Sequence, residues 1–160
     1  MSKAAFASAT TVSIAKSKAE IERLLTRYGA DQFAYAIEER RALIGFAVAA
    51  RKVRFVLPLP AKNERRFTHR ELKYGNEVER GEGAAIAEWE QENRRLWRSL
   101  ALIIKAKLEA VASGIVTFES EFLSHFVMPN GRTVGEDIGP KLLEMHESGK
   151  QVPLLGGDFN

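Results

Sequence analysis

The chain has 160 residues, of which 45% are hydrophobic and 28% are charged, and this composition predicts one globular domain with a substantial core. The absence of cysteine excludes disulfides, thiolate catalysis and cysteine-ligated zinc. No apolar run approaches the roughly 18 residues that a membrane span needs. We therefore expect a cytoplasmic protein without a membrane anchor, in which residues 1–12 form a loose N-terminus.

The first half of the chain predicts one helix followed by three strands. A capping box over Ser17 to Glu20 opens the helix, and Gly29 ends it. Large apolar residues then alternate with small or polar ones over residues 33–37, 44–48 and 53–57. This period of two indicates a three-stranded antiparallel meander.

The two faces of the predicted sheet differ in side-chain size. One face carries Phe, Tyr, Ile, Val and Leu and must face the core. The other carries Ala and Gly on two strands, and Lys52 and Arg54 on the third. Such a face of small side chains either lets another backbone approach closely or is a plain exposed surface.

Pro58 and Pro60 end the third strand, because proline cannot donate to a sheet ladder. Residues 61–83 are then charged, contain three glycines and show no sustained apolar period. We expect a long charged loop here, and loops of this length in compact domains are usually functional or disordered.

A single long helix is predicted over residues 84–113. Its apolar residues recur every three or four positions, and the stretch from Leu100 to Ile104 is apolar all round. Gly114 is the expected C-terminal stop. This helix is the only element long enough to cover the sheet, and we expect it to pack on the aromatic sheet face.

Two shorter helices should follow the long one. Thr117 can cap the first, and a capping box from Thr133 to Glu136 opens the second. Gly139-Pro140 should kink or split the second helix, and residues 150–160 should form an extended tail. The predicted fold is therefore a single α+β domain over residues 1–160: an N-terminal helix, a three-stranded antiparallel meander packed on one long helix, and two short C-terminal helices.

Positive charge is concentrated in residues 40–73. This window holds ten basic and two acidic residues, a net 10 − 2 = +8, so the remainder carries 3 − 8 = −5. Basic and aromatic residues are interleaved here, which suits phosphate neutralisation combined with base stacking, although a charge run can also be a solvated face. The candidate nucleic-acid-binding residues are Arg51, Lys52, Arg54, Lys62, Arg65, Arg66, Phe67, His69, Arg70, Lys73 and Tyr74.

Signals for catalysis are weak. The three histidines lie far apart, and the four-residue spacing of Glu121 and His125 fits either a metal or an ordinary helix pair. No nucleophile elbow or phosphate-binding glycine loop is present. We therefore expect no catalytic residues, no metal and no cofactor.

Helical periodicity places Lys107 on the same side of the long helix as its apolar stripe. A buried charge must be paired, so two interpretations remain open. Either its stem extends along the end of the stripe and carries the ammonium into water, or the ammonium reaches a ligand or an acidic partner.

Several segments resemble a family of small proteins from tailed phages and prophages. They run from Trp89 to Arg98, from Leu100 to Val111, from Thr117 to His125 and from Pro129 to Glu136, and the likeness extends over Ser17 to Leu155. That family has no established activity, so the resemblance implies only a phage setting and the cytoplasm of an infected bacterium.

The predicted order of elements is also similar to two nucleic-acid-binding architectures. Double-stranded RNA-binding domains share the order helix, three strands, helix, although the Lys-rich start of their second helix is replaced here by residues 83–88. Phage annealing proteins build a β-meander against a long helix beside a basic groove. Both likenesses are analogies of fold.

Three classes of function follow as hypotheses. The first is a non-catalytic nucleic-acid-binding accessory protein of a phage, acting on single-stranded DNA in replication or recombination. The alternative is a phage inhibitor that binds a bacterial host or defence protein through its basic face. The third is an enzyme whose site is assembled from distant residues. Assembly as a homo-oligomer is compatible with each of them.

Overall fold

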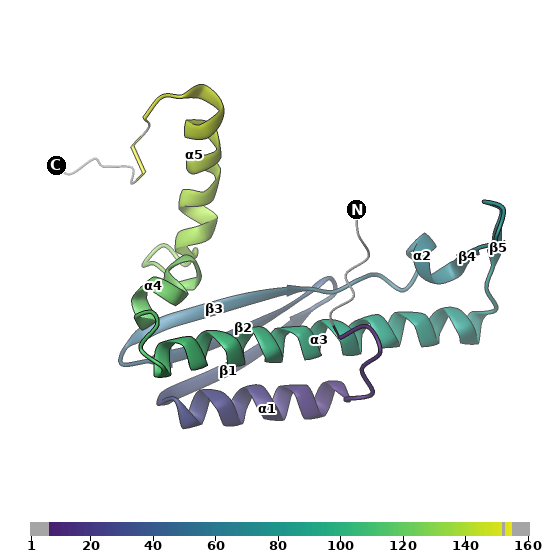
Figure 1. The fold of residues 1–160 in the computed structure, drawn as a ribbon, viewed down its shortest axis with the longest axis horizontal. Coiled ribbons are helices and arrows are strands. Elements are labelled where there is room, and N and C mark those ends of the chain that lie inside the picture. The colour runs from purple at the N-terminus through teal and green to yellow at the C-terminus, as the bar shows by residue number, and fades with distance from the viewer. Residues whose placement is uncertain (1–6, 152, 155–160) are drawn as a thin grey trace.

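The computed structural model describes residues 7–151 and 153–154. It has an α+β architecture in which helices lie against one face of a three-stranded antiparallel sheet of order β1-β2-β3 (Figure 1). A long helix packs on this sheet and short helices follow it, so the predicted fold class is confirmed. In chain order the elements are α1 (Ile14–Arg27), β1 (Ala30–Glu38), β2 (Arg41–Val48), β3 (Arg51–Pro58), α2 (Arg65–Thr68), β4 (His69–Glu71), β5 (Glu77–Glu79), α3 (Glu82–Ala112), α4 (Phe118–Phe122), the 3-10 turn η1 (Leu123–His125) and α5 (Val134–Ser148).

The core lies between the sheet and the helices α1 and α3. Ile44 in β2 pairs with Tyr35 in β1 and with Phe55 in β3, so the large residues of all three strands share one face. This is the face that the period of two predicted to be buried. The buried core contains Ile21, Leu24, Leu25, Ala42, Ile44, Phe46, Val53, Phe55, Leu57, Trp97, Leu100, Ala101, Ile104, Leu108 and Phe122.

Helix α3 begins two residues before its predicted start, with Gly81 at the N-cap. It buries Trp97, Leu100, Ile104 and Leu108, which recur at the predicted helical spacing. Gly114 has a positive φ of 71° after the helix, as expected for a C-terminal stop.

The predicted start of α1 is wrong by about one turn. The cap is Ser13, whose Oγ accepts a hydrogen bond from the Lys16 backbone N–H at 3.2 Å. The helix starts early because Ile14 packs against the core. Ser17 therefore lies inside the helix and is buried, and Glu20 forms an ion pair with Arg98 instead of closing a capping box.

Residues 61–83 are not the long loop that the sequence predicts. They contain α2 and an antiparallel two-stranded sheet in which His69 pairs with Glu79 and Glu71 with Glu77. The strands are three residues each, too short to show a periodic pattern, and Gly75 adopts the positive φ of 80° that their turn requires. We call residues 61–81 the hairpin arm; it lies along and beyond the N-terminal end of α3 (Figure 1).

Helix α5 runs unbroken through Pro140, contrary to the predicted kink or split. Proline cannot donate a hydrogen bond to the carbonyl four residues earlier, which is that of Glu136. The Arg132 guanidinium donates to this carbonyl instead, at 2.8 Å, and so compensates for the missing bond. The predicted capping box is confirmed, since Thr133 Oγ1 accepts from the Glu136 N–H at 3.2 Å and Glu136 accepts from the Thr133 N–H at 2.8 Å.

The segment before α5 extends the sheet at the edge of β3. The Val127 N–H donates to the Lys52 carbonyl at 2.9 Å, and isolated bridges join Val53 to Phe126 and Val127 to Thr133. This contact fixes where α5 leaves the body of the protein. None of the helices in residues 7–151 is long and apolar enough to cross a membrane.

Candidate functional site

The eleven predicted nucleic-acid-binding residues fall into two groups in space. Arg51, Lys52 and Arg54 lie on β3, beside the turn that joins it to β2, and the other eight lie in the hairpin arm at the opposite end of α3 (Figure 1). The structure therefore does not bring them together into one continuous surface. Each group therefore forms a candidate site of its own.

Most of the predicted positive charge is neutralised within the protein. Of the ten basic residues in residues 40–73, six lie within 4 Å of a carboxylate, and several of these carboxylates come from outside the window. Such pairing weakens the long-range attraction of polyanions. The six pairs are Arg40–Glu64, Arg41–Glu38, Arg51–Glu119, Arg54–Glu136, Arg65–Glu77 and Arg66–Glu64.

The hairpin arm itself is only weakly basic. Its 21 residues hold six basic and four acidic side chains, a net 6 − 4 = +2. The window that ends at Lys73 leaves out Glu77 and Glu79, and β5 folds these residues back alongside β4. Arg65 Nε donates to Glu77 at 2.6 Å across the fold.

Phe67 is not available for base stacking, which corrects its predicted role. Its side chain is buried, with only 4% of the residue exposed, because α2 packs against α3. The Arg66 guanidinium lies 4.6 Å from the centre of the Phe67 ring. Phe67 is therefore the apolar anchor of the hairpin arm.

Tyr74, the other aromatic residue predicted to stack on bases, is exposed. It lies in the turn between β4 and β5, and 89% of its surface is accessible. Arg70 and Lys73 are close to it in sequence, and neither forms an ion pair with any residue that the structure describes. These three residues, the arm tip, combine an exposed ring with two unneutralised cations.

The base of the hairpin arm is held by specific contacts. Trp89 of α3 donates its indole N–H to the Pro60 carbonyl at 2.8 Å, and the Lys62 ammonium lies 4.6 Å from the centre of the same indole. The Arg80 N–H donates to the Thr68 carbonyl at 2.7 Å, which closes the arm. The arm tip is thus presented on a supported element.

His69 contributes to the arm and is not free at its surface. Its Nδ1 lies 2.8 Å from the Thr68 hydroxyl oxygen, and its backbone carbonyl accepts from Arg80 Nε at 3.2 Å. Its side chain is only partly exposed. We therefore assign His69 a structural contact within the arm.

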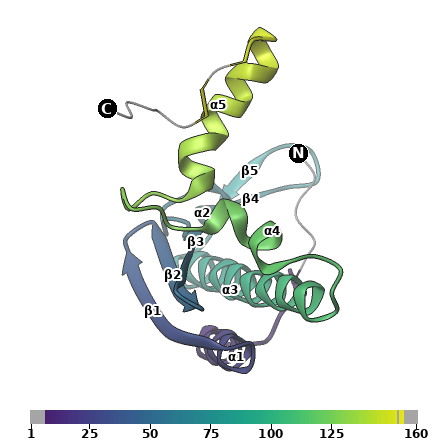
Figure 2. The ribbon, with the colours of Figure 1, turned by 90° about the vertical axis from the view of Figure 1, so that its left-hand side faces the viewer.

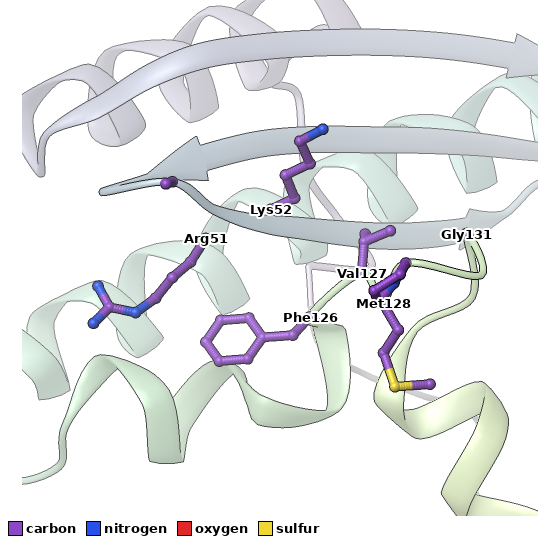
Figure 3. Close-up of a pocket in the computed structure, with 8 residues that line it drawn as sticks. Arg51, Lys52, Phe126, Val127, Met128 and Gly131 are labelled. Atoms are coloured by element: carbon purple, nitrogen blue, oxygen red, sulfur yellow. The ribbon is translucent and has the colours of Figure 1, made fainter. Parts of the chain in front are cut away.

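The β3 group borders a pocket of about 560 Å³. Arg51 and Lys52 leave β3 in opposite directions, as neighbours on a strand must, and Phe126 lies on the Arg51 side (Figure 3). Arg51 is paired with Glu119, so Lys52 supplies the unneutralised charge. The rest of the described lining is apolar or small: Ala50, Phe126, Val127, Met128, Pro129 and Gly131.

Lys107 reaches an acidic partner inside the protein. Its Nζ donates to Glu121 Oε1 at 2.8 Å and to the Glu121 carbonyl at 3.2 Å, which joins α3 to α4. His125 stacks on Phe55 with the ring centres 4.1 Å apart. Burial and the nearby ammonium of Lys107 lower the pKa of His125. These groups are used in packing α4 and η1 onto the core.

Within the described ranges 7–151 and 153–154, no group of three or more His, Asp or Glu side chains is arranged to hold a metal ion. Glu121 is already bound to Lys107, so its spacing from His125 reflects the packing of α4 and η1. No protein-family model, curated protein sequence or solved structure matches this chain. Function is therefore inferred from the residues and contacts of the chain itself.

Proposed function

We propose that the protein is a non-catalytic nucleic-acid-binding accessory protein that binds single-stranded DNA through the arm tip. The observation that carries this proposal is the exposed ring of Tyr74, which is close in sequence to Arg70 and Lys73, two cations without a carboxylate partner in the described residues. An exposed aromatic ring costs free energy in water and is a natural platform for an unstacked base. The resemblance to phage proteins supports a phage setting, and we place the protein in replication or recombination because these processes expose single-stranded DNA.

Single strands fit the arm tip better than duplexes do. Bases in a single strand expose their faces to a stacking ring, whereas bases in a duplex are already stacked. Two cations close to the ring in sequence can contact phosphates of the same strand. Because these contacts involve backbone and ring faces, binding should tolerate many sequences.

The test is a fluorescence-anisotropy titration of labelled single- and double-stranded DNA and RNA at two salt concentrations. Arg70→Glu with Lys73→Glu should weaken binding to all sequences. It should also reduce the slope of log affinity against log salt by about 1.4, the value for two lost phosphate contacts with a single strand. Tyr74→Ala should weaken single-strand binding by about 1–3 kcal/mol and leave the salt slope unchanged.

The matched control is Lys105→Glu, which reverses an exposed cation on α3 away from the hairpin arm. This variant should bind as the parent protein does. The proposal fails if the parent protein binds no oligonucleotide at low salt, or if the Lys105 variant loses as much affinity as the arm-tip variants.

The extensive internal ion pairing favours a second candidate, an inhibitor that binds a bacterial host or defence protein. Tyrosine and arginine are the residue types that most often dominate protein interfaces, and the arm tip offers both beside partly exposed Leu72. In this case a tagged form of the protein should co-purify with one defined bacterial protein, and Tyr74→Ala should abolish that co-purification. Nucleic-acid binding should then be absent at every salt concentration.

A further inference from the structure

The sheet leaves its outer face open. Helices α1 and α3 lie on one side of the sheet, and no described helix lies over the other side (Figures 1 and 2). An exposed face of an antiparallel sheet normally alternates polar residues with the buried ones. Here most of the central outward positions are small or apolar instead: Ala34, Ala36, Leu43, Gly45, Val56 and the buried Ala47. The exception is Arg54, which lies opposite Gly45 and is paired with Glu136.

Helix α5, in turn, has an apolar face that is not buried. None of its residues, Val134–Ser148, all of which the structure describes, is buried. Ile138, Leu142 and Met145 follow the spacing of one helix face, and the neighbouring Leu143 is 64% exposed. Helices of this length gain most of their stability from packing such a face, and Gly139 and Pro140 add little helix propensity.

Contacts at the first turn of α5 fix the direction of the helix. Arg54 Nη2 donates to Glu136 Oε2 at 2.9 Å, which ties the first turn to β3. Gly135 lies so close to η1 that a Cβ at this position would be 2.9 Å from the Ser124 carbonyl oxygen. Beyond these anchors α5 extends away from the sheet and from α1 and α3, so it leaves its own outer sheet face uncovered (Figures 1 and 2).

We propose that α5 of one copy packs on the outer sheet face of a second copy, and that the second copy makes the same contact in return. The reciprocal exchange closes a two-fold dimer in which each sheet is covered on both faces. This inference is independent of the proposed nucleic-acid binding.

The two surfaces match in size and in chemistry. A 15-residue helix is about 22 Å long and an eight-residue strand about 26 Å, so α5 spans the sheet along its strands. Ala and Gly side chains allow a helix axis to approach closely. Lys52 at the edge of this face has no described carboxylate partner within 4 Å, and Glu144 and Glu147 on α5 supply the opposite charge.

The area of the exchange reaches the lower bound for a specific interface. Helix α5, about 22 Å long and about 11 Å across, covers roughly 250 Å² of the sheet. Two such contacts, counted on both partners, bury roughly 1,000 Å², about the least area expected of a specific complex. A single α5–sheet contact would bury about half of this, which favours reciprocal exchange over a one-sided contact.

The first experiment is sedimentation velocity of the full chain over a wide range of concentration. The parent protein should sediment with twice the 17.9 kDa mass of one chain. Leu142→Asp with Met145→Asp should give a monomer, and so should Ala34→Glu with Ala36→Glu on the sheet. The control Ile115→Asp changes a 76% exposed apolar residue outside both surfaces and should leave the dimer intact.

A disulfide experiment tests the contact itself and does not depend on destabilising substitutions. Because the chain has no cysteine, Ala36→Cys and Leu142→Cys can be introduced separately and the two variants mixed under oxidising conditions. Disulfides between the two different variants should dominate over those between like variants.

Three results would overturn the proposal. The first is a parent protein that is monomeric at every concentration. The second is a dimer that persists with both sets of charge substitutions. For the third, Ala36→Cys and Leu142→Cys are placed in the same chain, and the contradicting result is an intrachain disulfide in the monomer. The last result would mean that α5 covers its own sheet.

Discussion

Arg54 on β3 and Glu136 on α5 are 82 positions apart in sequence, and their side chains meet at 2.9 Å. Glu136 also accepts from the Thr133 N–H, so one carboxylate serves both as a helix cap and as the link between α5 and the sheet. Hydrogen bonding to the Thr133 backbone is the largest cause that lowers the pKa of Glu136, and Arg54 acts in the same direction.

This relationship predicts a small coupling energy between the two side chains. Both are partly exposed to solvent, so a double-mutant cycle of Arg54→Ala and Glu136→Gln should give about 0.2–1 kcal/mol in urea unfolding. Thr133→Ala should cost about 0.5–2 kcal/mol, because it removes the helix cap. A coupling well above this range would mean that the pair is effectively shielded from water.

The second prediction concerns pH. The folded protein lowers the pKa of His125 through burial and the charge of Lys107, although hydrogen bonding to the Arg54 backbone and the charge of Glu121 oppose this. The unfolded chain, with an ordinary pKa of about 6.5, then binds a proton more readily than the folded protein does. The free energy of unfolding should therefore fall as the pH drops below about 6.5 and through the folded pKa.

Urea unfolding at a series of pH values checks this dependence. His125→Gln should remove the part of the pH dependence that comes from this side chain, even if the variant is less stable overall. The control His146→Gln removes an exposed histidine on α5 and shows what the loss of a histidine outside the core does to the profile. An identical loss of stability on acidification in the parent protein and in the His125 variant would contradict the prediction.

The third prediction concerns the turn between β2 and β3. Ala49 and Ala50 both have positive φ, 48° and 64°, in a two-residue hairpin turn that normally selects Asn-Gly. An L-residue with a Cβ is strained in this region by roughly 1–2 kcal/mol. Ala50→Gly, and Ala49→Asn with Ala50→Gly, should therefore increase the free energy of unfolding, the single change by about 1 kcal/mol.

An alanine with ordinary helical geometry supplies the control for this effect. Ala106→Gly, at an exposed position inside α3, should instead decrease the free energy of unfolding by about 1 kcal/mol. Opposite signs for the same chemical change would isolate backbone conformation as the cause. A destabilising Ala50→Gly would show that this turn does not carry the strain.

The fourth prediction separates the two aromatic residues of the hairpin arm. Phe67→Ala should loosen the arm, because it removes the buried anchor of α2, and trypsin should then cut at Arg65 and Arg70 much faster. Tyr74→Ala should leave the rate of cleavage unchanged, because the ring has few contacts to lose. Equal protease resistance of the parent protein and the Phe67 variant would show that Phe67 does not anchor the arm.

Features that depend on neighbouring residues were predictable from the sequence. The alternation in the three strands, the helical stripe from Trp97 to Leu108, and the caps at Thr117 and Thr133 all follow from local rules, and the structure confirms them. The start of α1 was missed because core contacts of Ile14 outweighed the capping box at Ser17.

The charge distribution was not predictable in the same way, because it depends on which residues meet in space. Nothing local indicates that Arg51 lies against Glu119 or Arg54 against Glu136. Three of the six pairs that neutralise the basic window use acids of β5, α4 and α5. Interleaved basic and aromatic residues also could not reveal which ring is buried, since Phe67 and Tyr74 have similar neighbours.

The two tryptophans report on two different parts of the molecule. Trp97 is 2% exposed beside Tyr35 in the core, whereas Trp89 lies at the base of the hairpin arm with Lys62 over its ring. Intrinsic fluorescence of a Trp89→Phe variant would therefore follow the core alone, and that of a Trp97→Phe variant would follow the arm. The chain thus contains its own pair of optical probes, with which opening of the arm can be timed separately from unfolding of the domain.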